Sequence, residues 1–297
     1  MNKSSYRSAS HITAFFKIAD LSQDLLSKGS CGAGFNIQRG VKTEITLANS
    51  SDHEIFIDNN KITIQSASIT KSVLDEIEKT IKRTIPALTI KYTFEVPLGA
   101  GYGTSASVAL TTAFAINDVL SLDIEELVLW QIAHKAEILN KTGLGDILGL
   151  YAKSAFEIRV QEGAPGVGKV ISPQIDVTEY DLYTLSFGPL SKKDILTDPI
   201  KRSKITEIGS VCLEKFQTNQ TFENFCNLAL DFSKAIDLLP DNLWKIVNSL
   251  PRTIKGSQIM LGESLFFFIP KNTLLPHIQS FVLIKESLTD NVLQKLS

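Results

Sequence analysis

Hydrophobic residues recur at two spacings along the chain, and together these spacings predict an α+β protein. Apolar side chains three or four positions apart predict helices at residues 68–84, 105–120, 123–140, 201–217, 221–236 and 241–249. Alternating or short continuous apolar runs predict strands at residues 41–48, 53–58, 61–65, 88–96, 181–187, 257–260, 263–269 and 280–285. The order of these elements indicates an N-terminal domain over residues 1–170 and a C-terminal domain over residues 171–297, with the active site between them.

Polar residues at the ends of these elements predict two local boundaries. Asn59 and Asn60 separate two predicted strands and indicate a hairpin turn. Asp123, followed by two glutamates, indicates the start of the helix at 123–140, because acidic side chains are favoured at helix N-termini.

The segment PLGAGYGTSAS, at residues 97–107, carries the strongest chemical signal of the chain. Glycines at positions 99, 101 and 103 follow a predicted strand, and a predicted helix opens at Thr104-Ser105. Without Cβ atoms the backbone N–H groups can approach an anion closely, and the helix N-terminus adds partial positive charge. The pattern fits neither a Walker loop nor a dinucleotide fingerprint. It predicts a phosphate-binding loop, or else an ordinary turn in which Thr104 or Ser105 only caps the helix.

A second cluster of candidate residues follows this loop in the sequence. Phosphoryl transfer from ATP needs a divalent cation, an oxygen ligand to hold it, and a group that orients or deprotonates the acceptor alcohol. Ser105, Glu137 and Asp146 could supply these functions. The alternatives are that Glu137 is a solvated carboxylate near a helix end and that Asp146 is a helix cap framed by turn glycines at 143 and 145.

Residues 97–106 resemble the central glycine-rich motif of the GHMP small-molecule kinases. A closer resemblance, to the archaeal pantoate kinases of coenzyme A biosynthesis, is carried by HITAFF (11–16), GSCGAGFNIQRGVKT (29–43), GLGDILG (143–149), IRVQEGAPGVG (158–168) and MLGESLFF (260–267). These segments cover nearly the whole chain. The resemblance implies a two-domain GHMP kinase fold, with an N-terminal ribosomal protein S5 domain 2-like part and a C-terminal ferredoxin-like α/β sandwich.

The resemblance also implies an activity and its cofactors. It implies an ATP- and Mg²⁺-dependent kinase that phosphorylates the primary hydroxyl of pantoate to 4-phosphopantoate, with Asp146 as the catalytic aspartate and Ser105 and Glu137 as Mg²⁺ ligands. The nucleotide would be bound by Pro97, Gly99, Ala100, Gly101, Gly103, Thr104, Ser105 and Ala106. Alternatives are another small hydroxy acid or sugar as substrate, and a catalytically silent sensor that binds a metabolite.

Four residues are expected on the substrate side: His11, Gly32, Gly34 and Arg159. His11 stands where related kinases carry a lysine near the transferred phosphate, or else it is a histidine packed in a strand. Cys31 replaces an arginine that is usual in the family, so Arg159, Arg39 or Lys28 could hold the substrate carboxylate instead. In the superfamily a glycine loop borders the substrate site, and residues 250–264 fall at its position, or else form a plain turn.

Composition limits the remaining classes. With 297 residues, 43% hydrophobic and 21% charged, the chain can bury a large core. Its net charge of −2 gives no broad positive field, so neither nucleic acid nor a membrane is expected as a partner. Three cysteines without metal-ligand spacing, and no apolar run of membrane-spanning length, predict a cytoplasmic protein. The family resemblance implies a homodimer.

Overall fold

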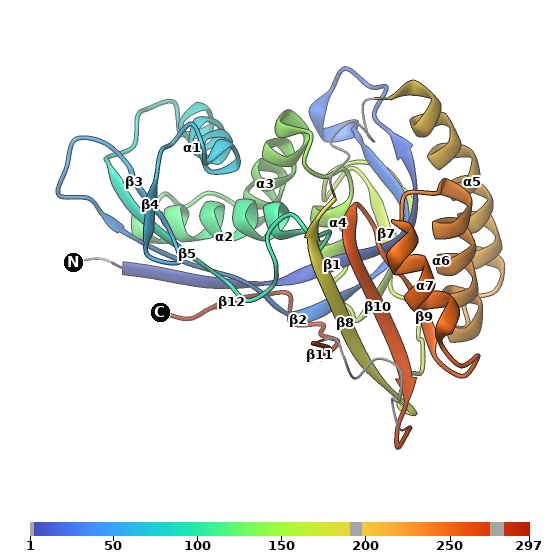
Figure 1. Ribbon diagram of the computed structural model, residues 1–297. Helices are drawn as coiled ribbons and strands as arrows, with labels where there is room; N and C mark the ends of the chain where they lie inside the picture. Colours follow the sequence, from blue (N-terminus) through green and yellow to red (C-terminus); the bar gives the residue numbers. More distant parts are fainter. Residues whose placement is uncertain (1–2, 191–197, 274–281) are drawn as a thin grey trace.

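The computed structural model, which describes residues 3–190, 198–273 and 282–297, contains two sheets flanked by helices (Figure 1). The first sheet has the strand order β12-β1-β2-β5-β3-β4, and β6 pairs with β2 and β7. Its strands are β1 (Lys3–Ala19), β2 (Gly29–Leu47), β3 (Glu54–Ile57), β4 (Asn60–Ile62), β5 (Leu88–Phe94), β6 (Phe156–Gln161), β7 (Lys169–Ile171) and β12 (Leu293–Lys295).

The second sheet is antiparallel and has the order β11-β8-β10-β9. Its strands are β8 (Tyr180–Pro189), β9 (Lys255–Ile259), β10 (Gly262–Pro270) and β11 (Ile284–Glu286). The helices are α1 (Ser68–Ile81), α2 (Thr104–Val119), α3 (Glu126–Asn140), α4 (Asp146–Tyr151), α5 (Pro199–Thr218), α6 (Phe222–Ile236) and α7 (Asp241–Ser249). The expected α+β class with two sheets is therefore confirmed.

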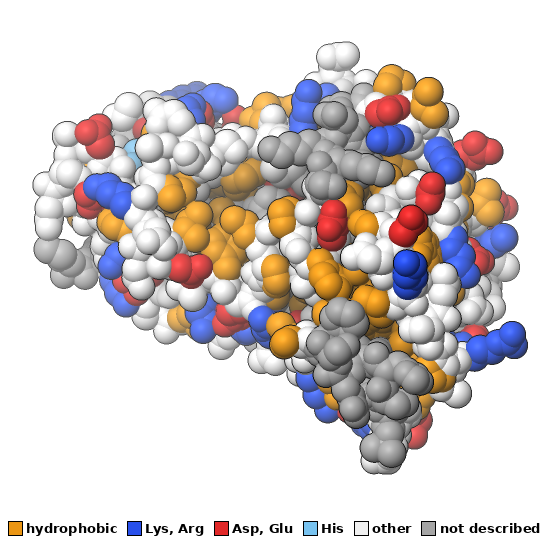
Figure 2. Space-filling model, in the orientation of Figure 1, with side chains coloured by type: hydrophobic (Ala, Val, Ile, Leu, Met, Phe, Trp, Pro, Cys, Tyr) orange, Lys and Arg blue, Asp and Glu red, His pale blue; other side chains and the backbone are white. Residues whose placement is uncertain are grey.

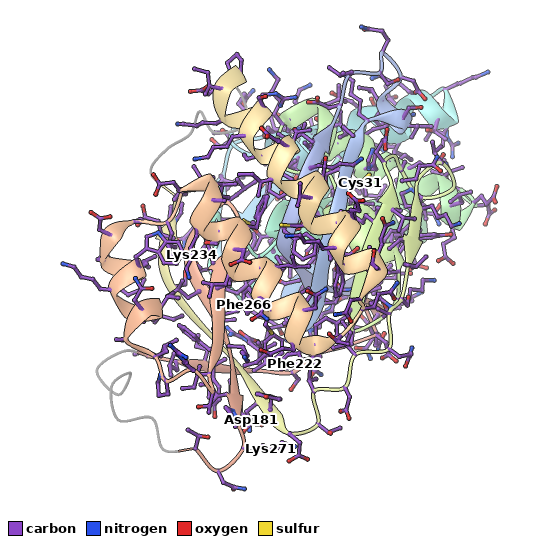
Figure 3. All side chains as sticks on the ribbon, turned by 90° about the vertical axis from the view of Figure 1, so that its right-hand side faces the viewer. Cys31, Asp181, Phe222, Lys234, Phe266 and Lys271 are labelled. Atoms are coloured by element: carbon purple, nitrogen blue, oxygen red, sulfur yellow. The ribbon has the colours of Figure 1, made fainter. Side chains whose placement is uncertain are left out.

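The long strands β1 and β2 form an antiparallel ladder, with two register shifts, that contributes to both hydrophobic cores. Their pairing runs from Lys3 opposite Thr46 to Ala19 opposite Gly29. At one end, β1 and β2 share a core with α1, α2 and α3. At the other end, phenylalanines of β1 and β2 pack against α5, α6 and β10, in the layer that Figure 3 views face on. The second sheet is built from residues beyond 170, but its core includes these N-terminal strands, and the last strand, β12, returns to the first sheet beside β1.

The sequence predicted β2 only from residue 41, whereas the strand begins at Gly29. Its glycines are needed because β1 and β6 flank β2 closely on either side. A Cβ on Gly32 would lie 2.2 Å from the carbonyl oxygen of Phe15, and one on Gly34 would lie 2.4 Å from that of Ile12. Glycine here permits close strand packing and does not mark a loop.

Three predicted boundaries are corrected by the structure. The hairpin between β3 and β4 turns at Asp58-Asn59, one residue earlier than expected, and both residues have the positive φ of a type I′ turn, 46° and 68°. Asp123 has a φ of 54°, so α3 begins after it, with Glu125 at the N-cap. The strand expected at 280–285 falls partly outside the described residues, and β11 begins at Ile284.

The face in Figure 2 has hydrophobic side chains gathered across its middle, whereas acidic and basic side chains are interspersed around it. Among the helices of the described residues, none is both long and apolar enough to cross a membrane.

Candidate active site

The glycine-rich segment is a loop between β5 and α2, as the sequence predicted. Gly99, Gly101 and Gly103 have φ values of 72°, 90° and 60°, which favour glycine, and Gly103 is the N-cap of α2. No side chain caps this helix, so neither Thr104 nor Ser105 serves as the cap. The three glycines, Thr104 and Ser105 line a cavity.

The second sheet closes this cavity through the turn between β9 and β10. Met260 and Leu261 line the cavity opposite the glycine loop. The two backbones touch, because a Cβ on Gly262 would lie 1.9 Å from the carbonyl oxygen of Ala100. The turn expected at 250–264 is therefore part of the site, which lies between the two halves of the protein.

Glu137 and Asp146 face each other across Gly143. A Cβ on Gly143 would lie 2.2 Å from Glu137 Oε2 and 2.6 Å from Asp146 Oδ2. Asp146 is the first residue of α4, and its side chain does not cap the helix, since the N-cap Gly145 precedes it. Gly143 and Asp146 both line the cavity, whereas Glu137 is buried behind Gly143 and does not line it.

Glu137 is only 2% exposed, so it is not a solvated carboxylate. Thr142 Oγ1 donates a hydrogen bond of 2.7 Å to its Oε1, whereas Oε2 is buried without a partner. Burial, and then the nearby charge of Asp146, raise the pKa of Glu137 to about 8, although the neighbouring hydroxyls of Thr142 and Ser105 oppose the rise. A buried carboxylate oxygen without a partner, beside a hydroxyl, is a donor set that suits a hard divalent cation.

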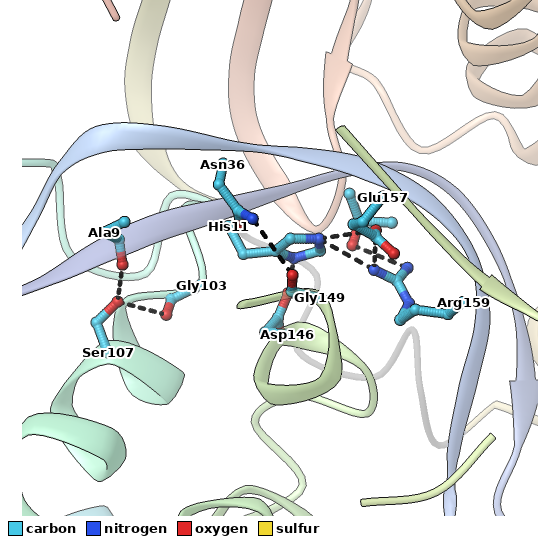
Figure 4. Close-up of polar contacts among 10 residues, drawn as sticks. Ala9, His11, Asn36, Gly103, Ser107, Asp146, Gly149, Glu157 and Arg159 are labelled. Atoms are coloured by element: carbon cyan, nitrogen blue, oxygen red, sulfur yellow. Dashed lines mark hydrogen bonds and ion pairs between the residues drawn. The ribbon is translucent and has the colours of Figure 1, made fainter. Parts of the chain in front are cut away.

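His11 lies behind Asp146 on β1 and is fully buried (Figure 4). Its Nδ1 is 2.7 Å from Asp146 Oδ1, and its Nε2 is 3.0 Å from Glu157 Oε1. Burial lowers the pKa of His11, but the hydrogen bonds with the two carboxylates outweigh it, so the pKa lies above its ordinary value. Shifts in the β1–β2 register occur on both sides of His11, at Ala9/Ser10 and Thr13/Phe15, as β-bulges often do beside active sites.

His11 does not line the cavity, so the expected substrate contact is replaced by a contact with the candidate catalytic residue. The alternative, a histidine packed in a strand, is correct but incomplete. The histidine is packed in β1, and both of its ring nitrogens face carboxylates.

Arg159 lies under the floor of the cavity. It is fully buried on β6 and forms an ion pair of 2.5 Å with Glu157. Its Nε is buried without a hydrogen-bond partner. A Cβ on Gly145 would lie 2.8 Å from this Nε and 2.3 Å from Ser30 Oγ, so the missing side chain brings both groups next to the cavity. The other two candidate cations, Arg39 and Lys28, are not among the lining residues, and Arg39 pairs with Glu286 at 2.8 Å.

Two further expected residues lie elsewhere. Gly32 and Gly34 are buried inside β2, paired with β1 and β6, and are not among the lining residues, so the anion-binding loop expected near them is a strand. Cys31 precedes them in β2 and is buried, its thiol donates to Glu162 at 3.4 Å, and burial raises its pKa to about 11. A reactive thiol is therefore excluded at this position.

The sequence missed Glu157, Ser30 and Thr13. Glu157 alternates with Arg159 on one face of β6, a spacing visible in the sequence once this segment is assigned as a strand. Ser30 and Thr13 line the cavity but have no local signal, because their roles depend on how β1 and β2 are packed.

Comparison with known proteins identifies the family of this chain. Residues 68–153, which include the glycine loop, Glu137 and Asp146, match the family described as GHMP kinases N terminal domain. The chain is 36% identical to the pantoate kinase of Methanocaldococcus jannaschii over 265 residues, 89% of this chain and 92% of that protein. It is 30% identical to the pantoate kinase of Thermococcus kodakarensis over 264 residues, 87% and 85% of the two proteins.

A solved structure described as a phosphotransferase related to the CoA biosynthesis pathway superposes with a TM-score of 0.85. It shares 25% sequence identity and covers 99% of this chain, which covers 98% of it. The chain belongs to the pantoate kinase family of the GHMP kinases.

Proposed function

We propose that this protein is an ATP-dependent pantoate kinase, which transfers a phosphoryl group to the primary hydroxyl of pantoate to give 4-phosphopantoate. The observation that carries the proposal is the space over Gly143, where Glu137 Oε2 and Asp146 Oδ2 face one another beside the glycine loop. Phosphoryl transfer depends on positioning and on charge stabilisation, and this arrangement can supply both. Membership of the pantoate kinase family supports the choice of substrate.

The glycine loop and the start of α2 would bind the phosphates of ATP. Pro97, Ala100 and Ala106 shape this segment, and its exposed donors come from the three glycines with positive φ and from the first turn of α2. Unpaired N–H groups of a helix N-terminus and the helix dipole both favour a polyanion here.

Ser105 and Glu137 would hold Mg²⁺. The unpartnered, buried Glu137 Oε2 and the adjacent Ser105 hydroxyl fit an oxygen-preferring cation. The described residues contain no group of three or more His, Cys, Asp and Glu side chains suited to a metal, so phosphate oxygens would complete its ligands. When bound, Mg²⁺ neutralises charge that develops on the transferred phosphoryl group.

Asp146 Oδ2 would accept or orient the proton of the substrate hydroxyl, since it faces the cavity while Oδ1 contacts His11. The substrate carboxylate would lie at Gly145, where Arg159 Nε and Ser30 Oγ can donate to it. Arg159 Nε is a buried cationic donor without a partner, and an anion would satisfy it.

The test is ADP formation by the purified protein with ATP and Mg²⁺ against pantoate, homoserine, mevalonate, glycerate and galactose, with mass detection of the product. Phosphopantoate alone supports the proposal. Another phosphorylated product would keep the kinase activity but identify a different substrate. ATP binding without any product would indicate a silent sensor. Asp146→Asn should abolish turnover and spare ATP binding, and unchanged turnover would contradict the role of Asp146.

A cytoplasmic location and a homodimer also stay predictions. Light scattering behind size-exclusion chromatography would decide the second, since a monomer of 32.7 kDa is readily separated from its dimer.

A further inference from the structure

The imidazole of His11 is held in one orientation from all sides. A Cβ on Gly149 would lie 2.4 Å from His11 Nε2, and one on Gly34 would lie 2.8 Å from the same atom. Both glycines therefore leave room for the ring and for nothing larger. The carboxylates of Asp146 and Glu157 bond its two nitrogens, and Figure 4 shows the ring between them.

The proton on Nδ1 follows from this geometry. A lone pair on Nδ1 would point at the carboxylate of Asp146 from 2.7 Å, which is repulsive, so Nδ1 must carry a proton and donate. This holds whether Nε2 is protonated and donates to Glu157 or accepts from Arg159 Nη1, which is 3.0 Å away. Asp146 Oδ1 is thereby occupied, and only Oδ2 remains for the cavity.

We propose that His11 is a positioning residue for phosphoryl transfer: its Nδ1–H fixes the Asp146 carboxylate with Oδ2 toward the acceptor hydroxyl, and Glu157 fixes His11. The inference rests on the proposed function, because it gives His11 a task only if Asp146 handles that hydroxyl. His11 itself touches no substrate, since its ring is fully buried and does not line the cavity.

Side-chain geometry supplies a matched pair of variants. Asparagine places its amide nitrogen as many bonds from Cα as Nδ1 of histidine, and glutamine places its amide nitrogen as many bonds from Cα as Nε2. His11→Asn can therefore donate to Asp146, whereas His11→Gln and His11→Leu cannot reproduce this bond.

We expect His11→Asn to keep kcat for pantoate within about tenfold of the wild type, and the other two variants to lose on the order of 10²-fold, the cost of a misplaced catalytic group. KM for ATP and for pantoate should change little in all three. Equal losses in His11→Asn and His11→Gln would overturn the proposal, and so would a loss that falls mainly on the KM for pantoate, which would indicate direct contact.

A measurement that needs no substrate tests the His11–Asp146 bond even if the variants fold poorly. In ¹⁵N-histidine-labelled protein, His11 should show a slowly exchanging, far-downfield imidazole proton on Nδ1, absent in His11→Asn and shifted in Asp146→Asn. Absence of this signal from the wild type would contradict the bond. If the wild type does not phosphorylate pantoate, the proposed function fails, while the imidazole signal still reports whether His11 holds Asp146.

Discussion

Alanine at position 143 would fill the space between the two candidate catalytic carboxylates. Gly143 has no positive φ, so its backbone accepts alanine, but the added Cβ would lie 2.2 Å from Glu137 Oε2 and 2.6 Å from Asp146 Oδ2. Ordinary contacts begin near 3.4 Å, so the two oxygens must move by 3.4 − 2.2 = 1.2 Å and 3.4 − 2.6 = 0.8 Å. A displacement of about 1 Å in a catalytic group costs on the order of 10²-fold in rate.

We therefore expect Gly143→Ala to lower kcat/KM for pantoate by about 10²-fold or more, measured by coupled ADP formation. ATP affinity, measured by calorimetry without Mg²⁺, should hold because the glycine loop is untouched. Overpacking should also lower the free energy of unfolding by about 1–3 kcal/mol.

Gly188→Ala is the matched control. Its φ of 120° makes alanine cost about 1–3 kcal/mol, yet its Cβ would meet no atom of the described residues within 4 Å, so stability falls while turnover should stay within a few-fold of the wild type. If Gly143→Ala were as active as this control, the space between the carboxylates would not be where the reaction is assembled.

Three further outcomes follow from groups in or near the site. The pKa of Glu137 is about 8 in the folded protein and near 4.5 in the unfolded chain, so between these pH values the folded protein keeps a proton that the unfolded chain has lost. Without Mg²⁺, the free energy of unfolding should therefore fall by up to about 1.4 kcal/mol per pH unit between pH 4.5 and about 8. Urea unfolding should show this slope disappear in Glu137→Gln, and an unchanged slope would contradict it. Gly262→Ala, whose Cβ would lie 1.9 Å from the Ala100 carbonyl oxygen, should raise KM for ATP more than KM for pantoate, and equal rises in steady-state kinetics would argue against a nucleotide loop. Iodoacetamide at neutral pH should leave Cys31 and Cys212 unmodified until the chain is denatured, since both are buried with pKa values of about 11, and mass spectrometry showing fast labelling would refute this.

The elements that the sequence predicted well are those with local signals. The helix expected at 105–120 is observed at Thr104–Val119, and the one expected at 221–236 at Phe222–Ile236, where Thr221 caps the helix through Asn224 N. The first half of β2 was missed because glycines suggest a loop when the neighbouring strands are unknown. Asp123 resembles a helix cap in composition, but a left-handed turn places it outside α3.

The same distinction, between local signals and contacts of residues far apart in the sequence, applies to the site. The glycine loop could be predicted because its φ angles and the start of α2 depend on neighbouring residues. The bond between His11 and Asp146 joins residues 135 positions apart, and Glu157 reaches the same ring from 146 positions away. No local pattern encodes such contacts, so Asp146 was found as a candidate, whereas His11 was expected on the substrate side and Glu157 was missed.

The ladder of β1 and β2 also determines how the molecule can move. This one pair of strands belongs to both cores, so among the described residues a rotation of one half against the other would have to bend the ladder itself. His11 lies on this ladder, so the residue behind Asp146 is held by strands that both cores share. The glycine loop and the turn at Met260, which line the cavity, are then the segments whose movement would admit substrates and release products.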